Sequence, residues 1–511
     1  MSDHHVIVIG AGAGGLAAAV DLAAQGMRVT VLEAAAAPGG KMHQVRSGEH
    51  LIDAGPTVLT MRWVFDDLFA RAGENFNDWL PVKPITTLAR HWWTDGSFLD
   101  LHADPRVTAA DIAGFAGSAD AEGYLRLCRD STAIFDLLKD SFMAAPKPNP
   151  ISLVHRVGWH RMRELLQLRP TQTLWQALGD YLGDARLRQL FGRYATYVGS
   201  SPLQAPATLM LITHAEQNGV WVLPGGMTAL ARGLQGLAEK HGATFRMNTQ
   251  VREIHCQGGR VSGVTLADGE QLAADQVVFN GDRQALASGR LGPGVIRAVT
   301  PTQPEQRGLS AVTWCLRADT AGFPLTYHNV FFGKDYPDEF AALFGRGDIT
   351  AEPTVYVCAQ DRLGSERPEG PERMLLLVNA PALGDEQPWD RPRLASITER
   401  AESVLRACGL KLSLDTATCR TAHPGEFAAR FPGSGGSLYG QATHGLLSSF
   451  ARPAARTRIG GLYLAGGSAH PGPGVPMATL SGQLAAAAVR EDVSRGYVRP
   501  PLLGQLLPKL R

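Results

Sequence analysis

Cysteine is scarce in this sequence and is never closely spaced. The chain has six cysteines in 511 residues and contains no C-x-x-C pair. Metal sites and disulfide frameworks show tighter spacing than this. We therefore expect free, mostly buried thiols in a reducing compartment, and no bound metal. The six are Cys128, Cys256, Cys315, Cys358, Cys408 and Cys419.

Net charge and long apolar runs are also lacking. The 49 basic and 48 acidic residues leave a formal charge of +1, which gives no electrostatic case for nucleic-acid binding. No run of about eighteen or more apolar residues occurs, and no basic and apolar leader precedes Val6. We expect a cytoplasmic protein that does not span a membrane. Its length and 44% hydrophobic content suit two to four domains with a large core.

The N-terminus carries the strongest motif. The apolar run 6–9 predicts a buried strand, and Gly10, Gly12 and Gly15 form a G-x-G-x-x-G turn into a helix. Gly10 permits the tight turn, Gly12 leaves room for a pyrophosphate, and Gly15 allows close packing of the helix on the strand. The start of the helix offers free N–H groups to phosphates. The segment therefore predicts a βαβ nucleotide-binding unit.

The residues after this unit narrow the cofactor. Glu33 ends the second strand, where a carboxylate can accept hydrogen bonds from an adenosine ribose. Gly39 and Gly40 follow, and the loop 53–57 comes soon after. A second glycine pair lets the backbone approach a long dinucleotide again beyond its pyrophosphate. NAD does not require this, so the pattern favours FAD.

This continuous pattern resembles the FAD-binding signature of the amine oxidase and phytoene desaturase superfamily. In that family the glycine pair is usually followed by arginine, whereas this chain has Lys41. Lysine keeps the positive charge but lacks the planar fork of arginine, which puts bidentate phosphate or backbone recognition in question.

The C-terminal segment is the second strong signal. A strand ending near Leu464 runs into a Gly/Pro loop that contains His470, and a helix over 478–490 follows. The helix N-terminus again presents N–H groups, here suited to the edge of a flavin ring. In the resembling family, the strand near Val251 pairs its backbone with the adenine. The expected cofactor-binding residues are Gly10, Gly12, Gly14, Gly15, Glu33, Gly39, Gly40, Lys41, Gly55, Pro56, Thr57, Val251, Gly466, Gly467, Gly474, Val475, Pro476 and Met477.

The sequence pattern changes twice in the middle of the chain, first to strands and then to helices. Residues 89–101 predict two strands joined by an Asp-Gly turn, with Trp92 and Trp93 on opposite faces. A helical region follows to about residue 218. Within it, 151–163 combines bulky apolar and basic side chains. This composition suits a helix at a membrane surface, and a solvated basic helix face is the competing interpretation.

The fold class expected is α/β: a Rossmann-like FAD-binding domain assembled from separated segments, a mixed-sheet substrate domain, and a helical region that faces a membrane in one of the two interpretations above. The FAD-binding segments are 1–103, 219–299 and 436–511. The helical region is 104–218 and the substrate domain is 300–435.

Further motifs extend the resemblance over nearly the whole chain. They are 219–226, 470–476 and 480–482, which together look like a bacterial carotenoid desaturase. Residues 53–62 and 90–96 are similar to the hydroxyneurosporene or methoxyneurosporene dehydrogenase branch. That branch implies 3,4-desaturation of an acyclic 1-hydroxycarotenoid by FAD, with a quinone, oxygen or another carrier as electron acceptor. It also implies a protein at the periphery of the inner or photosynthetic membrane.

Three polar side chains are candidates for contact with substrate or flavin. Glu216 and His214 lie just before the loop 219–227, and ordinary polar residues at a helix end are the competing interpretation. His470 either acts on the flavin ring or a proton, or supports the backbone. The sequence does not identify the group that binds the hydroxyl. A phytoene desaturase, a carotenoid isomerase, a flavin amine oxidase and a non-catalytic prenyl-binding protein are the alternative functions.

Overall fold

A five-stranded parallel sheet forms the centre of one half of the molecule. The computed structural model describes residues 4–158, 161, 164–165, 168–362, 368–414, 417–445 and 447–496. The strand order is β19-β13-β1-β2-β9. The strands are β1 (His5–Ile9), β2 (Arg28–Leu32), β9 (Thr244–Arg246), β13 (Gln276–Phe279) and β19 (Leu462–Leu464). This sheet is assembled from three distant parts of the chain, as the sequence predicts.

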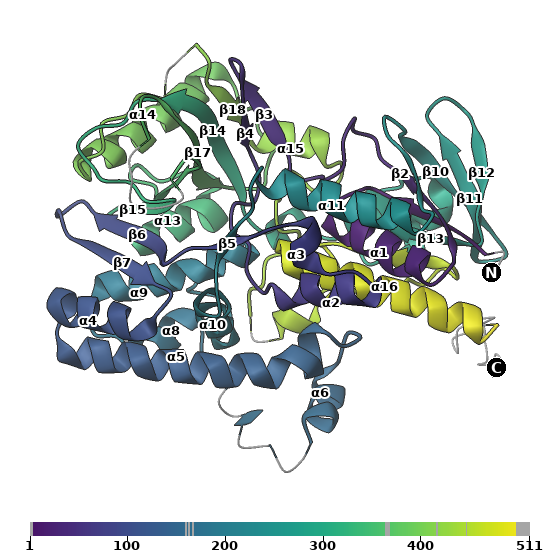
Figure 1. Ribbon diagram of the computed structural model, residues 1–511, viewed down its shortest axis with the longest axis horizontal. Coiled ribbons are helices and arrows are strands. Elements are labelled where there is room, and N and C mark those ends of the chain that lie inside the picture. Colours follow the sequence, from purple (N-terminus) through teal and green to yellow (C-terminus); the bar gives the residue numbers. More distant parts are fainter. Residues whose placement is uncertain are drawn as a thin grey trace, which may run out of the picture.

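Helices cover one face of this sheet and a three-stranded antiparallel sheet covers the other, because buried parallel strands need apolar cover on both faces. The covering helices are α1 (Ala13–Ala24), α2 (Trp63–Arg71), α11 (Met227–Lys240) and α16 (Val475–Ser494). Figure 1 shows α1 and α16 side by side next to the sheet. A Cβ atom on Gly482 of α16 would lie 2.0 Å from the carbonyl oxygen of Gly14, so these two helices touch backbone to backbone.

A smaller antiparallel sheet extends this half. Its strands are β10 (Val251–Gln257), β11 (Arg260–Leu266) and β12 (Gln271–Ala273), in that order. Glycines at positive φ form the turn between the first two strands, at Gly258 and Gly259. These strands form a hairpin insertion before β13.

The second half is built on a seven-stranded mixed sheet, ordered β18-β14-β17-β16-β15-β6-β7. The strands are β6 (Thr87–Trp93), β7 (Phe98–His102), β14 (Ser310–Ala318), β15 (His328–Phe332), β16 (Val355–Ala359), β17 (Glu372–Ala380) and β18 (Arg420–Ala422). The sequence analysis places 87–102 in the first FAD-binding segment. Strand pairing instead joins β6 to β15, so this hairpin extends the seven-stranded mixed sheet. The helix α14 (Arg391–Ala407) packs on the same sheet.

A helical layer lies under this sheet (Figure 1). It contains α4 (Pro105–Ala116), α5 (Ser118–Leu138), α8 (Leu174–Gly179), α9 (Ala185–Gly192) and α10 (Leu211–Gln217). Trp93 faces these helices and donates to Gln189 of α9 at 2.9 Å. Trp92 points to the other face, where its ring stacks on Phe98 with centroids 5.1 Å apart. The prediction of opposite faces is confirmed.

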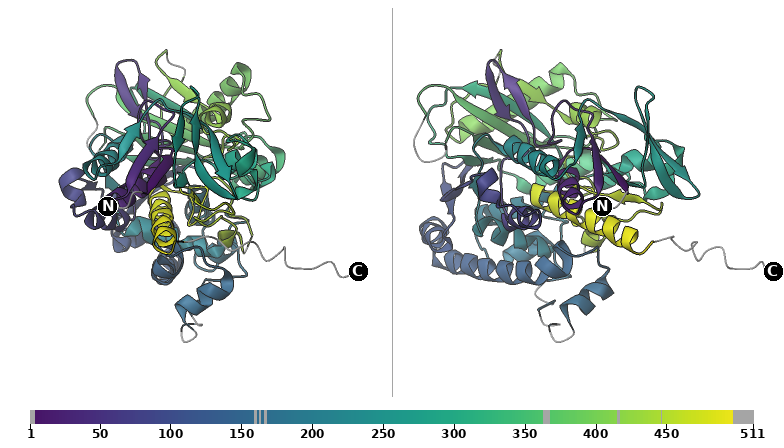
Figure 2. Two further views of the ribbon diagram at one scale, coloured as in Figure 1. Left: turned by 90° about the vertical axis from the view of Figure 1, so that its right-hand side faces the viewer. Right: turned by 45° about the vertical axis from the view of Figure 1, so that its right-hand side comes forward.

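The short helix α6 (Pro150–Val157) projects from this layer (Figure 2). Ile151 on α6 is 81% exposed. Residues 159–160 and 162–163 of the expected interfacial segment lie outside the described residues. Within the described chain, no helix combines the length and the apolar character needed to cross a bilayer.

Candidate active site

The turn between β1 and α1 has the geometry that the glycine pattern predicts. Gly10 has φ +97°, and a Cβ on Gly15 would lie 2.0 Å from the carbonyl oxygen of Gly10. A Cβ on Gly14 would lie 2.6 Å from the backbone nitrogen of Gly466. Gly12 begins α1 without a side-chain cap, so the first N–H groups of the helix stay open to a phosphate.

Glu33 points back toward this turn. Its carboxylate accepts hydrogen bonds from the backbone N–H groups of Ala11 at 2.6 Å and Ala35 at 2.8 Å. Val251 is buried at the start of β10 and packs in one cluster with Leu32 of β2. The acidic end of β2 therefore lies beside the phosphate turn, where an adenosine would bind.

The second glycine pair lies against the first turn. The N–H of Gly39 donates to the carbonyl of Ala11 at 2.8 Å, and a Cβ on Gly40 would lie 3.4 Å from Gly12 Cα. The two glycine motifs thus form one surface of backbone that no side chain covers from these positions. A Cβ at Gly55 would lie 1.8 Å from the carbonyl oxygen of Lys41, which also brings the loop 53–57 to this surface.

Lys41 is a cation enclosed by protein. Its Nζ donates to the carbonyl of Leu438 at 2.6 Å and lies 5.3 Å from the centroid of the Phe431 ring. Burial lowers the pKa of Lys41 to about 8, and the nearby Asp282 carboxylate opposes this fall. A lysine desolvated in this way favours an anionic ligand, because the ligand would restore its charged state.

The C-terminal loop closes the opposite side. Gly466 follows β19, and its neighbour Ala465 donates to the carbonyl of Phe279 at the end of β13. Gly474 has φ +104° and starts α16 with no side-chain cap, leaving Val475, Pro476 and Met477 in its first turn. The starts of α1 and α16 therefore both lie beyond the carboxyl ends of strands of the parallel sheet, where α/β folds bind nucleotides.

Asn280 is a residue of this surface that the sequence analysis did not select. It follows β13, and its Nδ2 donates to the carbonyl of Gly10 at 3.1 Å. Its side chain also lies within 3.0 Å of the positions that Cβ atoms of Gly12 and Gly466 would occupy. The signal available was its place directly after a four-residue apolar strand.

Asp53 was likewise missed. Its carboxylate accepts from the N–H of Met227 at 3.0 Å and from the hydroxyl of Thr228 at 3.4 Å. It therefore caps α11, whose own N-cap residue, Gly226, has no side chain. This bond fastens the loop 53–57 to the loop before α11, two motifs that are far apart in sequence.

His470 is buried and bound to the helical layer. Its Nε2 lies 3.0 Å from the carbonyl oxygens of both Phe142 and Ala145, so this nitrogen carries the proton. Its Nδ1 is buried with no partner among the described residues. Burial lowers the pKa of His470 to about 4, which leaves the ring neutral at pH 7. His470 thus holds the loop 465–474, which connects β19 to α16, against the short helix η1 (Lys139–Met143).

Glu216 is buried in α10, away from His470. Its carboxylate accepts from the Tyr194 hydroxyl at 2.6 Å, and burial raises its pKa, opposed by hydrogen bonds from Tyr194 and Tyr197. His214 of the same helix is half-buried, and its Nδ1 lies 2.9 Å from the Thr132 hydroxyl. The structure therefore places both residues in the helical layer, where they contact residues of that layer.

No cluster of three or more potential metal ligands occurs among the described residues. None of the six cysteines forms a disulfide bond with a described residue, and four of them are buried. The uncapped starts of α1 and α16, the glycine backbone, Glu33 and the enclosed Lys41 fit a flavin dinucleotide. The fold and site together define a nucleotide-dependent oxidoreductase of the flavoprotein class.

Comparison with known proteins agrees with this class. The model of the family "Flavin containing amine oxidoreductase" matches residues 13–490. A hydroxyneurosporene desaturase of Rubrivivax gelatinosus is 47% identical, covering 94% of this chain and 92% of the relative. One from Cereibacter sphaeroides is 44% identical, covering 96% of this chain and 98% of the relative. The chain therefore belongs to the flavin-containing amine oxidoreductases, in the branch of the hydroxyneurosporene desaturases.

Solved structures show the same fold. A putrescine oxidase matches with a TM-score of 0.58 at 16% identity, covering 96% of this chain and 99% of that one. An oxidoreductase of Methanosarcina mazei matches with a TM-score of 0.60 at 15% identity, covering 95% of this chain and all of that one. At this identity the likeness concerns the fold alone.

Replacement of Gly15 by alanine is expected to remove the flavin. The new Cβ would lie 2.0 Å from a backbone oxygen, so the turn must shift, at a cost of about 1–3 kcal/mol in unfolding free energy. The measurement is flavin absorbance per mole of purified protein, with a denaturant titration. Gly114→Ala is the control, because Gly114 faces open space on α4 and gains about 0.5–1 kcal/mol from the helix preference of alanine. Full flavin content in Gly15→Ala would contradict the packing described here.

His470 is expected to make the fold acid-sensitive. Its pKa is about 4 in the folded protein and near 6.5 when unfolded, so the unfolded chain binds more protons between these values. Stability is therefore lost as the pH falls from 6.5 to 4. His470→Gln, which keeps one N–H donor, should lose up to about 3 kcal/mol less over that window than the wild type. Urea titrations at several pH values test this, with the exposed His50 replaced by glutamine as the control. Equal pH profiles of wild type and His470→Gln would show that His470 titrates normally.

Proposed function

We propose that this chain is an FAD-dependent desaturase that introduces the 3,4 double bond into an acyclic 1-hydroxycarotenoid. Support comes from the hydroxyneurosporene desaturases that it resembles and from a 1-hydroxycarotenoid 3,4-desaturase of a Flavobacterium, 29% identical over 94% of this chain and 98% of the relative. The reaction turns the C3–C4 single bond into a double bond with the loss of two hydrogens. When bound, FAD supplies the electron acceptor for that loss.

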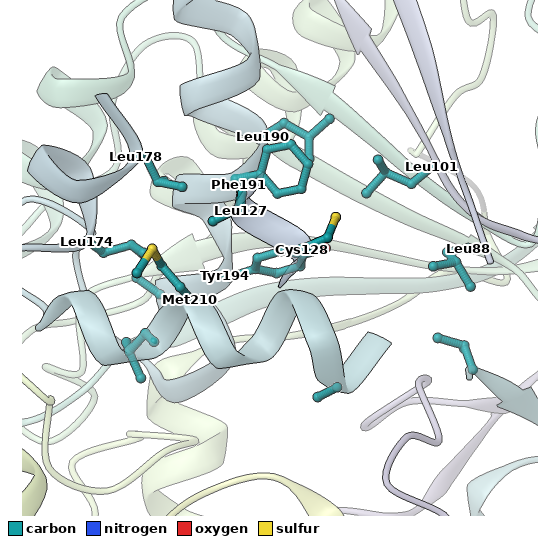
Figure 3. Packing of buried hydrophobic residues seen from close by; sticks show 14 of the residues in the cluster. Leu88, Leu101, Leu127, Cys128, Leu174, Leu178, Leu190, Phe191, Tyr194 and Met210 are labelled. Atoms are coloured by element: carbon teal, nitrogen blue, oxygen red, sulfur yellow. The ribbon is translucent and has the colours of Figure 1, made fainter. Parts of the chain in front are cut away.

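One observation carries the proposal: a continuous apolar cluster links the helical layer to the loop 53–57 and to α16, which directly follows the loop 465–474. The loops 53–57 and 465–474 are here called the flavin-side loops. The cluster contains Ala54 and Met61 near the loop 53–57, Leu480 of α16, and the inner faces of α5 and α9. Figure 3 shows part of it, with Leu127 and Phe191 close together. Such a region suits a long polyene, since it excludes water and gives it an apolar surface.

Polar groups have a limited part in this proposal. Charge that develops at an allylic carbon is delocalised along the polyene, so the reaction does not demand a strong base. We assign positioning roles to the two catalytic candidates. His470 holds the loop before α16 against Phe142 and Ala145, and Glu216 holds Tyr194 and Tyr197.

The cofactor contacts follow the same proposal. The open N–H groups after Gly12 would hold the pyrophosphate, Glu33 the ribose, and Lys41 would supply positive charge near the flavin. The first turn of α16, with Gly474, Val475, Pro476 and Met477, would border the flavin ring. The electron acceptor in this proposal is a quinone, oxygen or another carrier.

Co-expression with defined acyclic carotenoids tests the function. One set of substrates carries a 1-hydroxyl and the other does not. We expect the hydroxylated set alone to lose two hydrogens and to gain one conjugated double bond, read by mass and absorbance. Conversion of plain phytoene would indicate a general desaturase, and unchanged mass with altered geometry would indicate an isomerase. Either result would overturn the proposed reaction.

We also propose that the protein is cytoplasmic and docks on the inner or photosynthetic membrane, since a hydrophobic carotenoid resides in the bilayer. Ile151 on the projecting helix α6 and Leu447 are its most exposed large apolar side chains among the described residues, at 81% and 66%. Insertion of such side chains into the interface, with basic groups at the headgroups, gives reversible binding.

Ile151→Asp is expected to weaken binding to anionic phospholipid vesicles roughly tenfold, because burial of one isoleucine contributes about 1.5–3 kcal/mol. Co-sedimentation of the flavin-loaded protein measures this. Val107→Asp is the matched control, because Val107 is 44% exposed on α4, away from α6. An equal loss in both variants, or none in Ile151→Asp, would exclude docking through α6.

A further inference from the structure

Arg193 is an arginine held among aromatic rings between the helical layer and the mixed sheet. It begins the short helix η3 (Arg193–Val198), directly after α9. Its guanidinium carbon lies 5.5 Å from the ring centroid of Tyr197 and 5.4 Å from that of Tyr356. All three side chains are half-buried. The cation therefore rests on ring faces, which stabilise it without taking up its N–H groups.

The hydrogen-bonding capacity of Arg193 is largely unused. A guanidinium has five N–H donors. Within the described residues, Arg193 makes one side-chain hydrogen bond, a long one of 3.4 Å from Nη1 to the Tyr197 hydroxyl, and no ion pair. By contrast, the buried Arg452 donates to the carbonyl oxygens of Tyr439, Gly467 and Gln441. Arg193 is thus equipped to donate to a ligand.

The acidic groups near Arg193 are committed elsewhere. Glu216 accepts from the Tyr194 hydroxyl at 2.6 Å. Glu339 of α13 (Tyr336–Ala341) accepts from the Thr354 hydroxyl at 2.6 Å and from the Thr354 N–H at 3.3 Å. Burial raises the pKa of Glu339 to about 7, opposed by its Thr354 bonds and by the charge of Arg193. Neither carboxylate neutralises Arg193 by direct contact.

The histidines near Arg193 add no negative charge. Burial, followed by the charge of Arg193, lowers the pKa values of His91 on β6 and His328 on β15 to about 3. Both rings are therefore neutral at pH 7. His328 Nδ1 lies 2.7 Å from the Tyr356 hydroxyl, while its Nε2 is buried without a partner in the described chain. The surroundings of Arg193 are polar at a few points and otherwise apolar.

Two contacts bring Arg193 close to the flavin-side loops. The Tyr356 hydroxyl, under the guanidinium, lies 2.7 Å from the Thr57 hydroxyl of the loop 53–57. Tyr439 packs on Gly199, which directly follows η3. A Cβ atom on Gly199 would lie 2.6 Å from the Cβ of Tyr439. The carbonyl oxygens of Tyr439 and Gly467 both accept hydrogen bonds from Arg452, and Gly467 belongs to the loop 465–474 before α16. Arg193 is therefore linked to the loop 53–57 through Tyr356, and the end of η3 is linked to Gly467 through Tyr439 and Arg452.

This position matches the chemistry of the proposed substrate. In a 1-hydroxylated chain the oxygen is only three bonds from C3, one of the two reacting carbons. The group that binds this oxygen must consequently lie beside the flavin. A polar group at the far end of the polyene would be too distant from the hydroxyl. Among the described residues around the apolar cluster, Arg193 combines free donors with this position.

We propose that Arg193, supported by Tyr197 and Tyr356, is the specificity site that binds the tertiary hydroxyl oxygen of the substrate. The oxygen accepts an N–H from the guanidinium and thereby fixes C3 and C4 relative to the flavin-side loops. A plain hydrocarbon end leaves the cation facing apolar atoms without an acceptor, which costs binding free energy. This inference rests on the proposed function, since it names how that substrate is recognised.

Arg193→Met tests the site, because methionine keeps the apolar stem and removes every donor. The readout is the ratio of conversion of 1-hydroxylated to plain acyclic carotenoids in co-expression. We expect this ratio to fall roughly 10- to 100-fold, the range for a lost hydrogen bond to a charged group. Arg188→Met is the matched control. Arg188 belongs to α9 and lies over the ring of Trp175 on α8, whereas Arg193 lies over Tyr197 and Tyr356. The ratio of Arg188→Met should equal that of the wild type.

Binding is measured separately from turnover. The flavin-loaded protein is titrated with the hydroxylated 3,4-desaturated product and with a plain polyene of equal length, following quenching of tryptophan fluorescence. Arg193→Met should weaken binding of the hydroxylated ligand roughly 10- to 100-fold and should not weaken binding of the plain ligand, which no longer faces an unsatisfied cation. Equal weakening of both ligands, or of neither, would overturn the assignment.

A low flavin content per mole of protein would reveal that Arg193→Met is misfolded. Two further variants then test the site. Arg193→Lys keeps the charge but loses the fork, and Tyr197→Phe removes the only hydroxyl that Arg193 contacts among the described residues. Each should lower the selectivity ratio severalfold at normal flavin content, and an unchanged ratio in both would reject the site. If the wild type itself does not convert the hydroxylated set, the proposed function fails. If it does and the variants keep its selectivity, only the role of Arg193 fails.

Discussion

The close approach of α1 and α16 is the constraint on which the rest of the structure depends. Three glycines make it possible. A Cβ on Gly14 of α1 or on Gly482 of α16 would clash with backbone, and a Cβ on Gly466 would clash with the Asn280 side chain. Because the backbones touch, the starts of both helices lie at the same edge of the parallel sheet. Two sets of open N–H groups thus meet at one site, although more than 450 residues separate Gly12 from Gly474.

The second half of the molecule supplies what the nucleotide half lacks, an extended apolar interior. The mixed sheet places Trp93 and Phe332 on the face that the helical layer covers. The cluster reaches the flavin-side loops through Ala54 and Leu480. The two halves therefore share one apolar region at their junction, and residues at that junction belong to both the cofactor and the substrate side.

Charge inside this region is rare, and each buried cation has a distinct set of partners. Arg362 pairs with Glu372, and both are almost fully buried in the mixed sheet. Arg452 binds three carbonyl oxygens and ties the segment 439–441 to Gly467. Lys41 has a single carbonyl and Arg193 a single long hydroxyl contact among the described residues. Desolvated charges are costly unless they are paired, so poorly paired cations such as Lys41 and Arg193 are positions where a ligand gains binding free energy.

Local chemistry in the sequence alone determined the βαβ unit, the second glycine pair and the loop before the last helix. In each of these the informative residues are neighbours, and steric limits at glycine or an open helix start decide the conformation without reference to the rest of the chain. The opposite faces of Trp92 and Trp93 follow from strand geometry in the same way. Only the tertiary structure decided the pairing of β6 with β15, the cap that Asp53 provides for α11, and the position of Asn280 among the glycines. It alone also placed Arg193 above Tyr356, beside Thr57. These contacts join residues tens to hundreds of positions apart, and they depend on strand register and helix packing, which no short stretch of sequence encodes.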